Sequence, residues 1–145
     1  MTITTSGGAK IQRKLDKLQD PKPRKIALEA TANYIQAEVS EYPASGTANT
    51  ASNGYSWYVR GFGVRTRTGR AYRTSENLDK RWRVRVTARQ AVITNSASYS
   101  EYVHGKKQAR WHRRRGWVEG FKWLRSNRRK VMGVYERTYK RSTGI

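Results

Sequence analysis

The chain has 145 residues, of which 31 are Lys or Arg and 10 are Asp or Glu, so its formal net charge is +21. It contains no Cys, which excludes a disulfide framework and a thiolate zinc site. Ten scattered acidic residues favour a binding or assembly protein without cofactor or metal over an enzyme, and 16 aromatic residues predict a folded, aromatic-rich core.

The N-terminal third is expected to be helical. Residues 1–9 are expected to form a flexible terminus, and residues 10–19 place three apolar side chains at helical spacing. Pro21 and Pro23 are expected to interrupt the helical region. A second helix is predicted over residues 24–41, with an apolar face that comprises Ile26, Ala30, Tyr34 and Ala37.

The following segment is predicted to lack long elements. Residues 43–56 carry no charge and are rich in Ser, Thr, Asn, Gly and Ala, a composition typical of a loop. Residues 57–72 contain three Gly and alternate weakly, which fits either a two-stranded ribbon or a long basic loop. The domain is therefore expected to contain a long loop at residues 43–70.

The clearest strand pattern lies at residues 81–87. Trp82 and two valines alternate with three arginines, so the apolar and basic side chains fall on opposite faces. Residues 90–94 predict a second strand, joined to the first by a tight turn near residues 88–89. Residues 99–105 predict a third extended piece.

The C-terminal part is predicted to be the longest helix, over residues 117–140. Its expected apolar stripe comprises Trp117, Phe121, Leu124, Val131 and Tyr135. The predicted fold class is α+β: an antiparallel β-sheet packed with N-terminal helices and a long C-terminal helix. Residues 10–140 would form one domain, followed by a short tail at 141–145.

Two motifs in the middle of the chain resemble a known family. Residues 72–82, YRTSENLDKRW, resemble a signature of Tyr-Arg, small polar residues, Leu and a Trp that enters a strand. Residues 95–105, NSASYSEYVHG, resemble a segment ending in Tyr-x-x-Tyr-Val-x-Gly, and Gln108, His112 and Gly116-Trp117 follow at similar spacing. Together they resemble the tail-completion, or head–tail joining, proteins of long-tailed bacteriophages.

This resemblance implies a virion structural role in the neck. Such proteins are small α+β subunits that form a homo-oligomeric ring between the head connector or adaptor and the tail tube or terminator. A hexamer is the first expectation and a dodecamer the alternative. The resemblance also implies that phage DNA passes through the ring lumen, that particles assemble in the host cytoplasm, and that no motif residue is catalytic.

The basic charge is concentrated in residues 60–130, which hold 21 Lys and Arg against four Asp and Glu, a net charge of +17. An anionic partner is therefore expected there. Candidate contacts to the DNA backbone in a lumen are Arg65, Arg67, Arg81, Arg83 and Arg85. A solvated outer face and pairing with acids of a neighbouring subunit are the alternatives for the strand arginines.

Subunit-interface candidates come from the resembling segment and from the basic, Trp-containing run at residues 110–117. They are Trp82, Tyr99, Tyr102, Val103, Arg110, Trp111, Arg113, Arg114, Arg115 and Trp117. Trp and Arg are enriched at protein interfaces, and the same mixture suits stacking on single-stranded nucleic acid. His104 and His112 are expected to be hydrogen-bonded or partly buried rather than metal ligands.

Two functions from different classes therefore remain open. The first is a head–tail joining subunit, and the second is a stand-alone, non-sequence-specific nucleic-acid-binding protein, ribosome-like or regulatory. No apolar run approaches the roughly 18 residues of a membrane span, so no membrane partner is expected.

Overall fold

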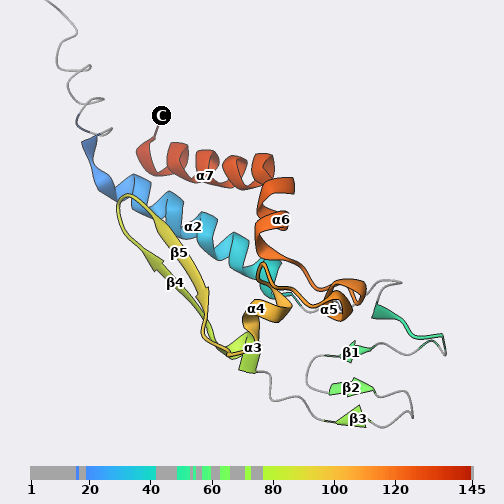
Figure 1. The fold of residues 1–145 in the computed structure, drawn as a ribbon. Coiled ribbons are helices and arrows are strands. Elements are labelled where there is room, and N and C mark those ends of the chain that lie inside the picture. The colour runs from blue at the N-terminus through green and yellow to red at the C-terminus, as the bar shows by residue number, and fades with distance from the viewer. Residues whose placement is uncertain are drawn as a thin grey trace, which may run out of the picture.

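The fold is α+β, as the sequence predicts. The computed structural model describes residues 19–41, 49–52, 57–59, 63–65, 71–72 and 77–144, with Asp16 and Gly54. The helices are α2 (Pro21–Ser40), α3 (Asn77–Lys80), α4 (Ser100–Val103), α5 (Arg110–Arg114), α6 (Gly120–Ser126) and α7 (Arg128–Thr143). The strands are β1 (Tyr58–Val59), β2 (Gly63–Arg65), β3 (Ala71–Tyr72), β4 (Trp82–Val86) and β5 (Ala91–Asn95) (Figure 1).

Helix α2 begins earlier than predicted. Its N-cap is Asp20, whose carboxylate accepts a 2.9 Å hydrogen bond from the backbone N–H of Lys22. Pro21 and Pro23 lie within the first turn, where the backbone N–H groups have no partner inside the helix. The predicted start at Arg24 is therefore wrong, whereas the predicted interruption is present at Asp20, whose backbone is extended between Gln19 and α2. The helix predicted at 10–19 lies outside the described residues, apart from two positions.

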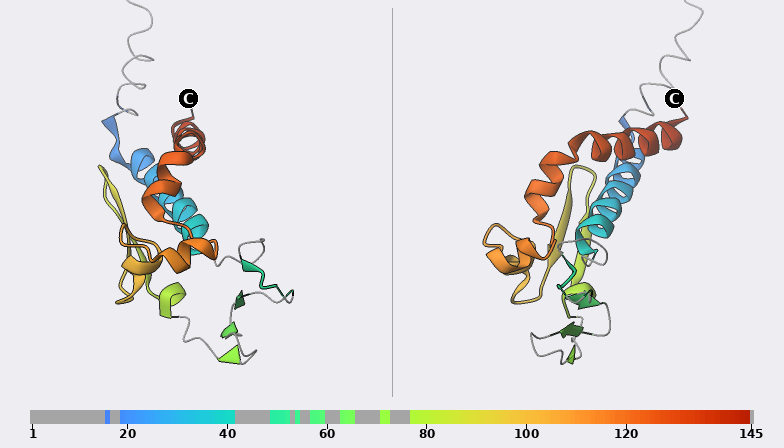
Figure 2. Two further views of the ribbon diagram at one scale, coloured as in Figure 1. Left: turned by 45° about the vertical axis from the view of Figure 1, so that its right-hand side comes forward. Right: turned by 90° about the vertical axis from the view of Figure 1, so that its right-hand side faces the viewer.

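Helix α2 is the middle layer of three. It packs along α7 on one side and against β4 and β5 on the other, and Figure 2 shows it between the hairpin and α7. Its buried residues include Ala27, Thr31 and Val39. Because α2 contacts two neighbours, the single apolar face predicted from Ile26 and Ala37 is wrong, and both side chains are exposed.

Strands β4 and β5 form an antiparallel hairpin, as predicted. Thr87 N–H donates to the Gln90 carbonyl at 2.8 Å and closes a tight turn. The Thr87 hydroxyl oxygen also accepts hydrogen bonds from the backbone N–H groups of Arg89 and Gln90. Local hydrogen bonds of this kind explain why alternation and turn residues were sufficient to predict this element.

The prediction of a third extended segment at residues 99–105 is wrong, because these residues form α4 and a tight turn. The N–H of Gly105 donates to the Glu101 carbonyl at 3.1 Å. A Cβ on Gly105 would lie 2.7 Å from that oxygen, so the close approach requires glycine.

The C-terminal helix is also different from the prediction. It is split into α6 and α7 at Asn127, whose side-chain amide donates to the Trp123 carbonyl at 2.9 Å. The Glu119 side chain caps the start of α6. The predicted apolar stripe is therefore divided, because Trp117 precedes α6 and Phe121 of α6 is 64% exposed. The longest helix of the described residues is α2, not the C-terminal helix.

Residues 57–72 contain three short strands within the described residues, rather than the predicted two-stranded ribbon or basic loop. Strand β2 pairs antiparallel with both β1 and β3. The described residues of the predicted 43–56 loop include Asn49, whose carbonyl accepts from the Trp57 N–H at 2.7 Å.

Candidate functional site

One face of the β4–β5 hairpin is basic and open. The arginines of β4, Arg83 and Arg85, are exposed and lie opposite Thr94 and Val92 of β5, which are also exposed. The alternate side chains turn toward α2 and are partly buried. Arg81, directly before β4, is exposed as well. We call these three arginines and their two β5 neighbours the arginine face.

Two of the three guanidinium groups of the arginine face donate to backbone carbonyls rather than to carboxylates. Arg83 donates to the carbonyls of Trp82 at 2.9 Å and Lys80 at 3.3 Å, and Arg81 donates to that of Ser96 at 3.4 Å. No carboxylate pairs with them in the part of the chain that the structure describes. Their charge is therefore available to an external anion.

Both edges of the hairpin are open as well. The backbone bonds from Ser96 N–H to the Arg81 carbonyl and across the Thr87–Gln90 turn fix which residues face the partner strand. The backbone groups of Val84 and Val86 must then point outward from β4, and those of Ala91 and Ile93 outward from β5. Among the described residues, neither edge pairs with a further strand.

A buried aromatic cluster supports the segment that follows the hairpin. The His104 ring lies between two indoles: its centroid is 5.5 Å from that of Trp82 and 5.3 Å from that of Trp117. Its Nδ1 is 2.8 Å from the Val118 carbonyl, so this nitrogen carries the proton of the neutral ring. Burial lowers the pKa of His104, and the Val118 carbonyl opposes this shift. The histidine is hydrogen-bonded and buried, as expected.

Gln108 ties together the two ends of the segment that carries α5. Its side-chain amide donates to the Val103 carbonyl at 2.7 Å and to the Trp117 carbonyl at 2.8 Å. His112 adds a 3.0 Å contact between its Nδ1 and the Tyr102 carbonyl. Although both residues occur in the family-like motif, nothing in the sequence indicated that they hold backbone carbonyls.

The predicted interface residues divide into exposed and buried members. Val103 and Trp117 belong to the buried core cluster, which corrects their assignment to a surface; Trp82 is partly buried. Arg115 stacks over the Trp57 ring at 3.5 Å. The members that remain exposed are Tyr99, Tyr102, Arg110, Trp111, Arg113 and Arg114.

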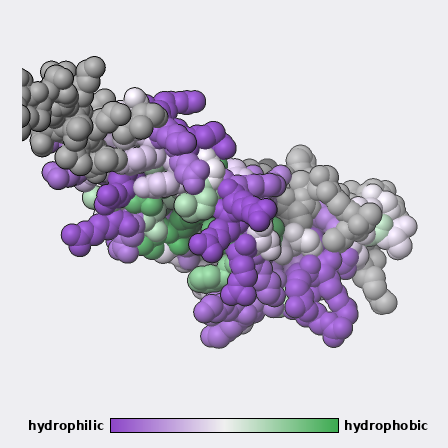
Figure 3. All heavy atoms as spheres, turned by 90° about the horizontal axis from the view of Figure 1, so that it is seen from above, coloured by the Kyte–Doolittle hydropathy of each residue, from purple (hydrophilic) through white to green (hydrophobic). Residues whose placement is uncertain are grey.

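Two of the predicted lumen residues are not described in full. Arg65 lies on β2, and its side chain is outside the described part, as is the whole of Arg67. Outside these predicted residues, helices α6 and α7 carry five exposed cationic side chains, namely Lys122, Arg125, Arg128, Arg129 and Lys130. Hydrophilic side chains accordingly dominate the face in Figure 3, around a smaller hydrophobic area.

Two other kinds of functional feature, a metal site and a membrane span, are absent from the described residues. No cluster of three or more His, Cys, Asp or Glu there could hold a metal ion, and no described helix has the length and apolarity to cross a membrane. Comparison with known proteins found no matching family model, curated protein or solved structure.

Proposed function

We propose that this chain is a head–tail joining subunit of a long-tailed bacteriophage, a virion structural protein that forms a ring in the neck. The proposal rests on the family-like motifs at residues 72–117 and on the open hairpin. Its neighbours in the particle would be the head connector or adaptor on one side and the tail tube or terminator on the other.

The observation that carries this proposal is that the hairpin is open on one face and along both edges. A two-stranded sheet is marginal by itself, and among the described elements α2 covers its inner face while no further strand pairs with its edges. Neighbouring subunits that cover the outer edges would complete the sheet. Repeating one such contact with a constant rotation closes a ring, as in a hexamer or a dodecamer.

The arginine face suits the lumen of this ring. Guanidinium groups contact phosphates without reading the bases, so they would tolerate DNA of any sequence. Alternate residues of a strand are about 6.6 Å apart, which distributes Arg81, Arg83 and Arg85 along the strand as a row of cations. The row would offset the charge of passing DNA without holding it in one register.

A stand-alone nucleic-acid-binding protein is the second candidate. It is favoured by the exposed ring of Trp111, which lies among Arg110, Arg113 and Arg114 on α5. Both candidates bind DNA more weakly as salt rises. DNA affinity therefore does not separate them, whereas a fixed number of copies in a particle does.

Quantitative mass spectrometry of gradient-purified phage particles tests the proposal. The particles are washed in high salt and treated with nuclease before the copies of this chain are counted. Retention at a fixed low copy number, a multiple of six, is the expected result. Loss of the chain with the wash or with the nucleic acid would refute a joining role and favour the stand-alone binder.

A further inference from the structure

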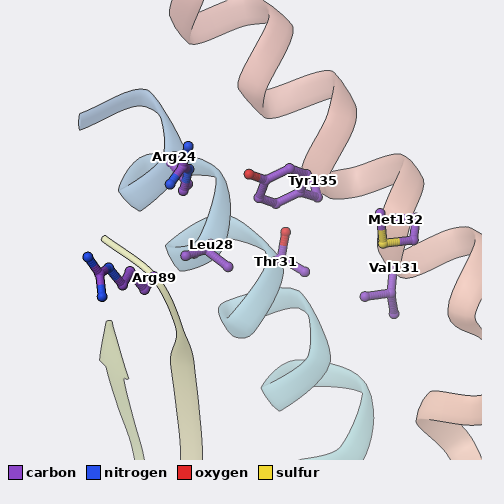
Figure 4. A pocket seen from close by; sticks show the side chains of 7 residues that line it. All are labelled: Arg24, Leu28, Thr31, Arg89, Val131, Met132 and Tyr135. Atoms are coloured by element: carbon purple, nitrogen blue, oxygen red, sulfur yellow. The ribbon is translucent and has the colours of Figure 1, made fainter. Parts of the chain in front are cut away.

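An apolar cleft of about 270 Å³ lies between α2, α7 and the tip of the hairpin. Leu28 and Thr31 of α2 lie on one side, and Val131, Met132 and Tyr135 of α7 lie on the other (Figure 4). This volume is just below that of typical small-molecule pockets, which start near roughly 300 Å³. The cleft is therefore suited to one or two side chains of a protein partner.

Two arginines from different elements line the same cleft. Arg24 comes from the first turns of α2, and Arg89 from the hairpin turn. Both are exposed, and no carboxylate pairs with either of them in the described ranges. Apolar walls do not suit a phosphate backbone, whereas an aromatic side chain beside a carboxylate would satisfy both the walls and the arginines.

The chain itself exposes such a combination at residues 99–102, which we call the α4 knob. Tyr99 is 42% exposed and Tyr102 is 51% exposed, with the exposed carboxylate of Glu101 between them. Glu101 pairs with Lys107 at 3.5 Å, but an exposed pair of this kind is weak and can be exchanged. The knob therefore has the chemistry that the cleft requires.

Among the described residues, the most exposed large hydrophobic side chain does not fit the cleft as well. Phe121 is 64% exposed, but the ammonium group of Lys106 lies over its ring at 5.1 Å and Lys122 follows it directly. Docking Phe121 in the cleft would bring these cations toward Arg24 and Arg89. Like charges at such a contact are unfavourable.

We propose that the α4 knob of one copy docks in the apolar cleft of the next copy. This inference rests on the proposed ring and specifies one of its subunit contacts. Because the knob and the cleft are different surfaces of the molecule, the contact is heterologous, which is the type that closes rings. Tyr99 and Tyr102 would bury their rings against Leu28 and Met132. Glu101 would face Arg24 and Arg89.

Cysteine cross-linking tests this contact directly, because the chain has no cysteine of its own. The Tyr102→Cys and Met132→Cys variants are purified separately, mixed and mildly oxidised. A disulfide requires Cα atoms within about 7 Å, so we expect a Tyr102→Cys/Met132→Cys dimer to dominate. An Arg125→Cys variant, altered at an exposed position of α6, is the control and should cross-link with neither.

Charge reversal provides the second arm, measured as self-association by sedimentation. Glu101→Arg, and separately Arg24→Glu with Arg89→Glu, should each weaken association about tenfold or more. All three changes in one chain should restore self-association to within about threefold of the wild-type affinity. Glu29→Arg, which alters an exposed carboxylate that does not line the cleft, is the matched control and should have no effect.

The outcomes separate this contact from the proposed function. If the wild-type chain forms rings but the Cys variants do not cross-link selectively, the contact is overturned and the ring proposal stands. The same conclusion follows if the triple charge reversal does not restore association. Selective cross-linking together with absence from washed particles would support the contact and refute the joining role. Cross-linking of the Met132→Cys variant to a different virion protein alone would also overturn the contact.

Discussion

Gln108 holds two backbone carbonyls with one side-chain amide, so replacing it with Ala should destabilise the whole domain. The acceptor residues, Val103 and Trp117, are both buried in the core cluster. A hydrogen bond contributes about 0.5–1.5 kcal/mol net, and a buried group left unpaired costs about 1–3 kcal/mol. For Gln108→Ala we therefore expect a loss of about 2–4 kcal/mol in the free energy of unfolding.

Urea denaturation followed by tryptophan fluorescence measures this loss. The matched control is Gln90→Ala in the exposed hairpin turn, where Gln90 bonds to Thr87 through its backbone N–H and carbonyl. The control should change the free energy of unfolding by less than about 0.5 kcal/mol. A loss below about 0.5 kcal/mol for Gln108→Ala would refute the reasoning, because the two carbonyls would then have found other partners.

Three further predictions address the arginine face, the buried His104 and the glycines. Reversing Arg83 and Arg85 to Glu should impair particle assembly or DNA passage, measured as phage titre, while the isolated subunit keeps its free energy of unfolding. Burial lowers the pKa of His104 from 6.5, so the unfolded chain binds a proton at this residue more readily than the folded chain does. The contribution of His104 to the free energy of unfolding should therefore be fully present above pH 6.5 and be lost as the pH falls below it, as measured by urea midpoints. Gly105→Ala should cost about 1–3 kcal/mol, because its Cβ would lie 2.7 Å from a backbone oxygen. Gly133→Ala should be neutral or stabilising by up to about 1 kcal/mol, because its Cβ meets only the end of a flexible arginine.

Each of these predictions has an internal control. Reversing Arg125 and Arg128, which are exposed on α6 and α7, should leave the phage titre unchanged. A fully infectious Arg83/Arg85 double variant would contradict the role of the arginine face. A flat stability profile between pH 7.5 and 5 would contradict the burial of the histidines, since the pKa of His112 is also lowered by burial. Equal costs at the two glycines would contradict the close approach at Gly105.

Elements governed by neighbouring residues could be predicted from the sequence. The hairpin is specified by alternation between Trp82 and Val86 and by the turn hydrogen bonds of Thr87. The C-terminal end of α2 was also placed to within one residue. Its start was not, because a proline in the first turn has the same sequence signature as a proline that ends a helix.

Features that depend on tertiary contacts could not be predicted. The miss at residues 99–105 was local instead: Tyr99, Tyr102 and Val103 lie at helical spacing, and the segment forms α4 and a turn closed by the Gly105–Glu101 hydrogen bond. The apolar stripe of the C-terminal helix continues past Asn127, and nothing in its period marks the break there. The apolar cleft brings together Arg24 and Arg89, which are far apart in the chain, so no local pattern contains it. The Gln108 hydrogen bonds reach Val103 and Trp117, which are nearby in sequence, but no helical or strand period marks them.

The charge of the chain places a condition on any ring that it forms. Each copy carries +21, and bringing copies together concentrates that charge, so self-repulsion opposes assembly. Attraction between Glu101 and two arginines offsets only a small part of it. An arginine face directed at DNA removes the conflict, because phosphates neutralise the cations that neighbouring copies bring closest together. DNA in the lumen and contact between subunits would then be mutually stabilising, which would reconcile so basic a surface with the self-association that we propose.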